Sequence, residues 1–339
     1  MKIAFFEIFS EILSKEKDAL KKFFHNDSVS FFSEKLSQKN ADSIKDAEII
    51  SVFTNSSVDK DIIDLLPNLK FINTTSTGFD HIDVNYCAKK GIKVSNVPAY
   101  GSVTVAEFTF ALLLNLSRKV EKANNRLRQD DDFDITALRG FDLKNKTLGV
   151  IGTGKIGKNV IKIAHGFGMN VIAYDLYPDL VFAKENNFTY KNFDEIISDS
   201  NIITLHTPYN KENHHLINKK NISMMKRGVY LINTARGALI DTPALLWGLQ
   251  EGIIAGAGLD VLENERDLKE EIKILSSGQV DMIKDYKTLL EDHVLIDMPN
   301  VTVTPHIAFY SKEAEEAIMR VTVDNIRGFI SGAPINLVK

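Results

Sequence analysis

The chain has 339 residues, 44% of them hydrophobic and 25% charged, and 41 Lys and Arg oppose 45 Asp and Glu, giving a formal net charge of −4. These values are typical of a soluble protein long enough for two domains, and the near balance of charge argues against nucleic acid or an anionic membrane as partner. A single cysteine excludes an internal disulfide. No apolar run reaches 18 residues, and the N-terminus lacks a signal-like stretch. A cytoplasmic location is therefore expected.

Short apolar runs alternate with amphipathic segments along the first hundred residues, which predicts a parallel α/β sheet. The expected strands are 3–6, 29–32, 48–52, 71–74 and 93–95, with helices between them such as 59–66 and 83–90. After the break at 96–98, a long helix is expected from about Val103 to Arg128. We interpret it as a buried core helix whose apolar width also suits a subunit interface.

A second α/β series begins at Thr147, after an acidic loop at 130–134. Its six expected strands, 147–151, 171–174, 202–205, 229–232, 255–259 and 301–303, match a six-stranded doubly wound sheet. The charged stretch 267–300 is interpreted as a peripheral helix pair, with a lid as the alternative. A final helix over about 312–330 returns to the first series.

This order predicts two doubly wound α/β domains. A Rossmann NAD-binding domain, 102–306, is expected to be inserted into a flavodoxin-like substrate domain made of 1–101 and 307–339.

Residues 150–157 read Val-Ile-Gly-Thr-Gly-Lys-Ile-Gly, so Gly152, Gly154 and Gly157 have the G-x-G-x-x-G spacing. The motif follows an expected strand and precedes a helical pattern, as dinucleotide binding requires. The next apolar run ends on Asp175, whose carboxylate can accept hydrogen bonds from a ribose 2′-hydroxyl and would repel a 2′-phosphate. The sequence therefore predicts NAD as cofactor.

Three polar segments, 233–237, 258–265 and 304–310, follow successive strands of the second series, where an open α/β sheet binds ligands. Arg236 can grip a carboxylate with its planar guanidinium. His306 can exchange a proton near neutral pH, and a carboxylate beside it would favour its charged form. Each residue alone is ambiguous, but Arg, Glu and His together indicate a hydride-transfer site.

Other polar residues have plainer interpretations. His206 ends a strand and is expected to shape the cofactor site. His214 and His215 are adjacent in a loop and are expected to point to different sides, which makes a poor metal site. Cys87 is expected to be a small buried hydrophobe. No spacing matches a zinc or calcium site, so no metal is predicted.

With these motifs in place, the chain resembles the D-isomer-specific 2-hydroxyacid dehydrogenases over most of its length. The matching segments are 76–83, 103–107, the glycine motif with Asp175, 206–208, 233–241, 259–265 and 304–308. The resemblance implies Arg236 as substrate binder, Glu265 as the carboxylate that orients the histidine, and His306 as acid/base. It also implies that the backbone around Thr77 and Gly78 meets the substrate carboxylate.

The resemblance implies further contacts as well. Those with the cofactor are expected from Thr104, Lys155, Ile156, Asp175, His206, Thr207, Pro208, Asn213, Thr234, Ala235, Arg236, Asp260, His306 and Ala308. Tyr100, otherwise a packing residue, is added to the substrate-binding candidates because it lies near the predicted domain junction.

Many members of the family have a glycine after His-x-Ala, where this chain has Phe309-Tyr310-Ser311. That departure, with segment 97–100 and the extended stretch after Glu265, resembles the D-lactate dehydrogenase branch. Pyruvate and D-lactate are the expected substrates, and a dehydrogenase for larger keto acids, such as 2-ketoisocaproate or phenylpyruvate, is the first alternative. The second is an NAD-sensing interaction protein of the corepressor type. A homodimer is expected.

Overall fold

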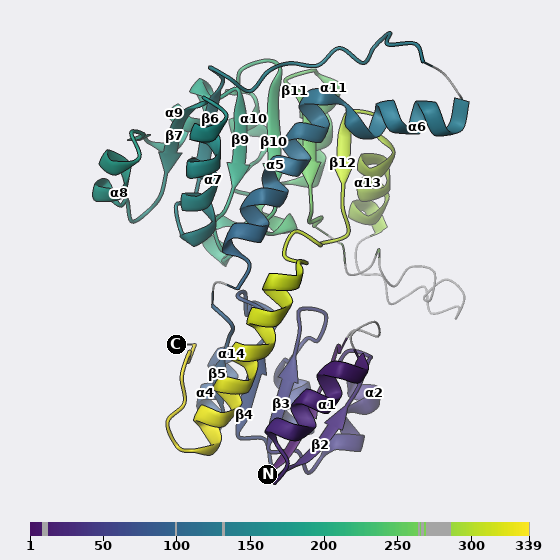
Figure 1. The fold of residues 1–339 in the computed structure, drawn as a ribbon, viewed down its shortest axis with the longest axis vertical. Helices are drawn as coiled ribbons and strands as arrows, with labels where there is room; N and C mark the ends of the chain where they lie inside the picture. The colour runs from purple at the N-terminus through teal and green to yellow at the C-terminus, as the bar shows by residue number, and fades with distance from the viewer. Residues whose placement is uncertain are drawn as a thin grey trace. The chain divides into compact units, whose positions relative to one another are not determined.

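The computed structural model describes residues 1–8, 13–98, 100–130, 133–263, 265, 268 and 286–338. The chain divides into two compact units, Met1–Tyr100 with Ser311–Lys339, and Gly101–Tyr310. Each unit has one sheet of parallel strands with helices on both faces (Figure 1). The sequence places the boundaries after residues 101 and 306, whereas the structure places them after Tyr100 and Tyr310. The loop that carries His306 therefore lies wholly within the larger unit.

The smaller unit has five strands in the order β2-β1-β3-β4-β5, which is the flavodoxin-like order. Their bounds are Lys2–Phe5 for β1, Ser28–Phe31 for β2, Ile49–Val52 for β3, Phe71–Thr74 for β4 and Lys93–Ser95 for β5. Every residue of β3 and β4 is buried, because helices cover both faces of the parallel sheet around its inner strands.

Helices from both ends of the chain cover one face of this sheet. Helix α1, Leu13–Phe23, and helix α14, Lys312–Ile330, pack on the same apolar cluster as Phe71 (Figure 1). The other face carries α2, Gln38–Ala41, α3, Lys60–Asp64, and α4, Val84–Lys90. Asn325 in α14 is fully buried and donates to Asn73 Oδ1 at 2.9 Å, which fixes the C-terminal helix to its sheet.

The larger unit has seven strands in the order β12-β11-β10-β9-β6-β7-β8. Their bounds are Thr147–Ile151 for β6, Asn170–Tyr174 for β7, Thr189–Tyr190 for β8, Ile202–Leu205 for β9, Val229–Asn233 for β10, Ile254–Leu259 for β11 and Val301–Val303 for β12. The prediction of six strands is wrong by one, because two-residue β8 is too short to show a period. Strands β6 to β11 have the doubly wound dinucleotide-binding order.

Helices α5, Ser102–Arg118, and α7, Lys155–Gly166, lie on one face of this sheet (Figure 1). The other face carries α9, Phe193–Asp199, α10, Lys219–Ile222, and α11, Thr242–Gln250. Short α8, Leu180–Glu185, precedes β8, and α13, Tyr286–Asp297, packs on α11 and β12. Helix α13 falls in the stretch interpreted as a helix pair, of which residues 267 and 269–285 lie outside the described residues.

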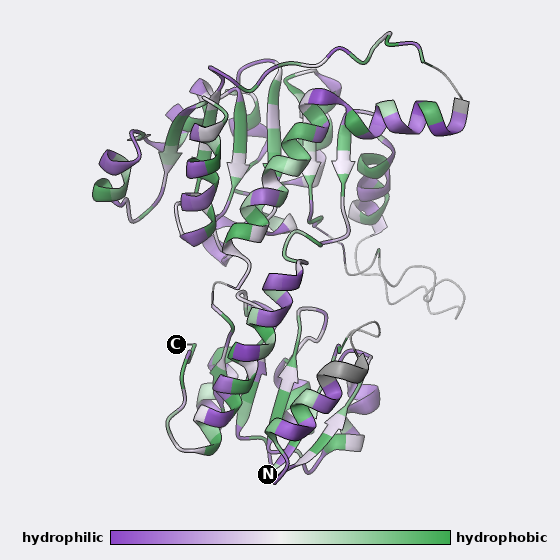
Figure 2. Cartoon of the chain, viewed as in Figure 1, coloured by the Kyte–Doolittle hydropathy of each residue, from purple (hydrophilic) through white to green (hydrophobic). Residues whose placement is uncertain are grey.

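The prediction of one long helix over 103–128 is wrong. Lys119 has a left-handed backbone, with φ of 54°, and ends α5; a second helix, α6, spans Val120–Asp130. Figure 2 shows the difference between the two, since α6 is mostly hydrophilic whereas α5 is apolar where it packs against α7 and the sheet. Among the helices that the structure describes, none combines the length and apolar character needed to cross a membrane.

Candidate active site

Strands β10, β11 and β12 are neighbours in the sheet, and their last residues, Asn233, Leu259 and Val303, pair in register. Parallel strands end at the same edge of a sheet, so the loops that follow these three strands meet there. Arg236 follows β10, Glu265 follows β11 and His306 follows β12. The three residues therefore lie on adjacent loops at one edge of the larger unit.

The imidazole of His306 is held by Glu265, whose Oε1 atom lies 2.8 Å from Nδ1. A carboxylate can only accept, so this contact favours a proton on Nδ1. Among the described residues Nε2 has no partner and is the nitrogen left for a ligand. Both side chains are mostly buried, at 18% and 31% exposed. This arrangement can hold a proton at Nε2 with a negative charge behind it.

The backbone of His306 has a left-handed conformation, with φ of 57°, which side-chain-bearing residues rarely adopt. Asp260 holds the loop in this shape: its carboxylate accepts the N–H groups of Ile307 and Ala308, both at 2.9 Å, and the Thr304 hydroxyl at 2.6 Å. Burial raises the pKa of Asp260, and these donors oppose the shift. Asp260 was predicted to contact the cofactor; in the structure both of its carboxylate oxygens accept bonds from the His306 loop.

The loop that carries Arg236 is shaped by Asn233, which is fully buried at the end of β10. Its Oδ1 accepts from the Ala235 N–H at 3.0 Å, and its Nδ2 donates to the Arg236 carbonyl at 2.8 Å. No role for Asn233 is predicted from the sequence, although a polar residue that ends an apolar strand is a usable signal. At Gly237 a Cβ atom would lie 2.0 Å from the Leu262 carbonyl oxygen, so the loops after β10 and β11 touch there.

The glycine motif forms the turn between β6 and α7. Gly152 has φ of 93°, and a Cβ atom there would lie 2.7 Å from the backbone of His206. At Gly157 a Cβ would lie 2.0 Å from the Gly152 carbonyl oxygen, so the helix packs closely on the turn. At Gly154, the cap residue of α7, a Cβ would meet nothing within 4 Å. The turn is thus packed on its protein side and open at the helix N-terminus, as a pyrophosphate needs.

Asp175 lies directly after β7 and is tied to this turn. Its Oδ2 accepts from the Thr153 N–H at 2.6 Å and hydroxyl at 2.9 Å, and its Oδ1 accepts from the Tyr177 N–H at 2.9 Å. These bonds fix an anionic group beside the glycine turn. Together with the open Gly154 position, they fit a dinucleotide whose adenosine ribose carries a free 2′-hydroxyl.

The loop after β9 carries four of the predicted cofactor contacts. His206 Nε2 lies 2.8 Å from Thr204 Oγ1, and burial lowers the pKa of His206 to about 3, so the ring is neutral at physiological pH. Its buried Nδ1 has no partner among the described residues. Asn213 donates to Thr207 Oγ1 at 3.1 Å and to the Pro208 carbonyl at 2.7 Å, which fixes the turn after the strand.

The remaining candidates are spread over both units. Thr104, Lys155 and Ile156 lie in the first turns of α5 and α7, and the Thr234 hydroxyl lies 3.1 Å from that of Thr109. Thr77, Gly78 and Tyr100 belong to the smaller unit.

Hydrogen bonds fix Thr77 and Gly78 in the segment after β4, and these bonds do not involve the N–H groups of the two residues. The Thr77 hydroxyl donates to the Val97 carbonyl at 2.9 Å, and Ser76 donates to the Gly78 carbonyl at 2.6 Å. Within the described part of the chain, the N–H groups of Thr77 and Gly78 donate to no protein atom. They are therefore open to an anionic ligand.

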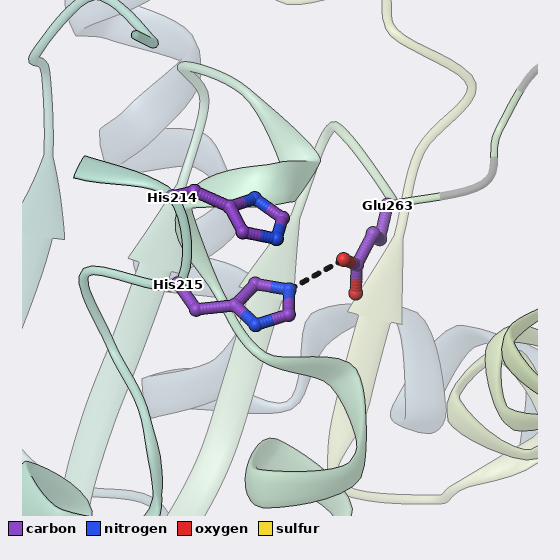
Figure 3. Close-up of side chains that lie close together, drawn as sticks. All are labelled: His214, His215 and Glu263. Carbon is purple, nitrogen blue, oxygen red and sulfur yellow. Dashed lines mark hydrogen bonds and ion pairs between the residues drawn. The ribbon is translucent and has the colours of Figure 1, made fainter. Parts of the chain in front are cut away.

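The interpretation that His214 and His215 point to different sides is wrong. Their rings stack with centroids 3.8 Å apart, and both face Glu263, whose Oε1 is 2.5 Å from His215 Nε2 (Figure 3). Adjacent side chains point apart in extended backbone, but His215 is left-handed, with φ of 53°, and turns its ring to the same side. Glu263 thus pairs with His215, and Glu265 with His306.

Comparison with known proteins agrees with this arrangement. The family model for the NAD-binding domain of D-isomer-specific 2-hydroxyacid dehydrogenases matches residues 110–308. The chain is 39% identical over 283 residues to an aromatic 2-oxoacid reductase of Clostridium sporogenes, covering 83% of this chain and 82% of the relative. It is 36% identical over 308 residues to the D-lactate dehydrogenase of Escherichia coli, covering 90% of each. The crystal structure of D-lactate dehydrogenase from Aquifex aeolicus, complexed with NAD and lactic acid, matches with a TM-score of 0.89 at 37% identity, over 99% of this chain and 98% of that one.

Proposed function

The chain belongs to the D-isomer-specific 2-hydroxyacid dehydrogenases, NAD-dependent oxidoreductases, and from this premise we propose that its own reaction is the interconversion of pyruvate and D-lactate. The observation that carries the chemistry is the 2.8 Å contact between His306 Nδ1 and Glu265 Oε1, which leaves Nε2 for a substrate oxygen. The choice of pyruvate is supported by the likeness to the two D-lactate dehydrogenases and by Phe309-Tyr310-Ser311 after His306.

In this proposal Arg236 binds the substrate carboxylate through its planar guanidinium. The N–H groups of Thr77 and Gly78, which donate to no other described residue, are proposed as further donors to a substrate carboxylate. Bound NADH supplies the hydride, and NAD⁺ accepts it in the reverse direction. Fixing the substrate in one orientation lowers the entropic part of the barrier.

Protonated His306 donates its Nε2 proton to the keto oxygen as that oxygen becomes an alkoxide, and takes the proton back in D-lactate oxidation. Glu265 keeps the ring oriented and stabilises the imidazolium that reduction requires. Asp260 acts through the backbone of the His306 loop, so we assign it a positioning role.

A second candidate function is reduction of a larger keto acid, such as phenylpyruvate or 2-ketoisocaproate. The observation that favours it is the 39% identity to an aromatic 2-oxoacid reductase. Arg236, Glu265 and His306 would have the same roles, and the two functions would differ only in the residues that contact the substrate side chain. An NAD-sensing interaction protein of the corepressor type would keep the site and lack turnover.

The test is a panel of 2-keto acids, comprising pyruvate, hydroxypyruvate, 2-ketoisocaproate and phenylpyruvate, assayed for NADH oxidation at a series of concentrations. We expect the highest kcat/KM with pyruvate and formation of the D isomer of lactate. A higher kcat/KM with phenylpyruvate or 2-ketoisocaproate would replace the proposal by the second candidate. Binding of NADH without turnover of any member would replace it by the sensor.

A further inference from the structure

His214, His215 and Glu263 form a second histidine–carboxylate cluster, distinct from the His306–Glu265 pair (Figure 3). We propose that these three residues bind one divalent transition-metal ion, with Zn²⁺ as the reference ion. The three potential ligand atoms all lie within 4.8 Å of one another. Around a tetrahedral zinc ion with bonds of about 2.0–2.2 Å, ligand atoms lie about 3.3 Å apart, so modest side-chain rotations bring them to coordination distance.

The donor set selects the kind of ion. Two imidazole nitrogens and one carboxylate oxygen suit zinc, cobalt or nickel, whereas magnesium and calcium prefer oxygen ligands alone. Three protein ligands leave a tetrahedral site one position for water. His214 is exposed, and His215 and Glu263 are partly buried, so an ion can enter from solvent.

Groups behind the ligands already orient them. Glu263 Oε2 accepts from the Thr242 hydroxyl at 2.9 Å, which leaves Oε1 directed at the histidines. The Tyr209 hydroxyl lies 3.4 Å from His214 Nδ1, which leaves Nε2 for the ion. Such outer partners fix ring orientation in protein metal sites.

The backbone of His215 is also held. Its N–H donates to the Ala238 carbonyl at 2.9 Å, and its carbonyl accepts from Asn218 Nδ2 at 3.0 Å. These bonds maintain the left-handed conformation that places both rings on one side. In this structure His215 Nε2 and Glu263 Oε1 form a 2.5 Å hydrogen bond, and an ion bound by both atoms would replace this bond and separate the two atoms.

The experiment uses the untagged full chain in equilibrium with Zn²⁺ and a chromophoric chelator, and repeats the titration with Co²⁺, read by its visible absorption. We expect one ion per chain. Removing even a group behind a ligand weakens metal binding by about 10–100-fold, so His214→Ala and Glu263→Gln are each expected to weaken it by at least about tenfold. The matched control, His25→Ala, removes an exposed histidine of the smaller unit and leaves the affinity unchanged.

His214→Ala is the decisive variant, because it leaves the His215–Glu263 and Glu263–Thr242 bonds in place and is expected to fold as wild type. Absence of metal binding in the wild-type chain overturns the proposal. So does a His214→Ala variant that binds as wild type, or a His25→Ala variant that loses the ion. None of these readouts depends on keto-acid turnover, so the metal site and the proposed function fail separately.

Discussion

Oε1 of Glu265 lies 2.8 Å from Nδ1 of His306, while Glu263, two residues earlier, bonds to a different histidine. The two carboxylates are close in sequence and have separate partners. Substitutions at the two positions therefore separate two effects: loss of the carboxylate that contacts His306, and disturbance of the loop that carries both carboxylates.

Glu265→Gln is expected to move the pH profile of the enzyme. Keto-acid reduction needs protonated His306, and the neutral amide no longer stabilises the imidazolium, so the alkaline limb of kcat/KM for reduction moves to lower pH. Oxidation of the hydroxy acid needs neutral His306, so its acidic limb moves in the same direction. Glu263→Gln is the control and leaves both limbs in place. Unmoved limbs in Glu265→Gln would exclude Glu265 as the partner of the proton donor.

Arg236→Lys keeps the positive charge and loses the planar guanidinium, which can donate two hydrogen bonds to one carboxylate. A hydrogen bond to a charged group is worth about 1.5–3 kcal/mol, so losing one lowers kcat/KM for the keto acid by at least about tenfold. We expect KM to rise and kcat to fall. NADH affinity, followed by quenching of intrinsic fluorescence, should fall by less than kcat/KM for the keto acid. Wild-type kinetics would remove Arg236 from the site.

Cofactor choice is expected to depend on Asp175. Its carboxylate is fixed beside the glycine turn and repels the 2′-phosphate of NADPH, so kcat/KM is higher with NADH. Asp175→Ala is expected to reduce the ratio of kcat/KM with NADH to kcat/KM with NADPH. The measurement is kcat/KM for each cofactor at saturating keto acid, and equal values in the wild type would contradict the assignment.

Two glycine-to-alanine changes should separate an effect on stability from an effect on cofactor binding. Gly237→Ala puts a Cβ about 2.0 Å from the Leu262 carbonyl oxygen, and the forced backbone shift lowers the free energy of unfolding by about 1–3 kcal/mol. At Gly154 a Cβ has open space, so Gly154→Ala folds as wild type but weakens NADH binding, because the methyl occupies the phosphate approach. Denaturant titration and NADH titration of both variants measure the two effects.

The chain is expected to form a homodimer. Helices α5 and α6 leave Val103, Val120 and Leu127 at 56%, 60% and 39% exposed. Family resemblance places the subunit contact in this segment. Sedimentation equilibrium at micromolar concentration should give twice the chain mass of 38.0 kDa, and a species of 38.0 kDa would contradict the prediction.

The sequence predicted most of the architecture, because strand and helix periods are local properties of the chain. The turn at the glycine motif could be predicted from the sequence, since Gly152 and Gly157 each meet a local steric requirement there. Two of the misses, the helix break at Lys119 and the orientation of His214 and His215, share one cause: a backbone conformation that residue type does not reveal. Lys119 is left-handed without being glycine, so the predicted long helix is two helices.

Several features of the site also lie beyond what local patterns in the sequence can predict. Spacing along the chain allowed either Glu263 or Glu265 beside His306, and the choice of Glu265 came from family resemblance. The left-handed turn at His215 brings two adjacent histidines onto Glu263, a grouping that alternation of side chains would exclude. The role of Asp260 depends on bonds across 44 to 48 residues of sequence, which no local pattern displays.

The boundary after Tyr310 bears on how the gene for this chain can recombine. The glycine turn, Asp175, Arg236, Glu265 and His306 all lie within Gly101–Tyr310, one uninterrupted stretch of the chain. Two crossovers in a gene, one at each end of this stretch, would transfer the whole set as a cassette. The flanking segments that form the smaller unit, with Thr77 and Gly78, could then diverge on their own. Such a transfer keeps the proton donor, its carboxylate partner and the cofactor turn together.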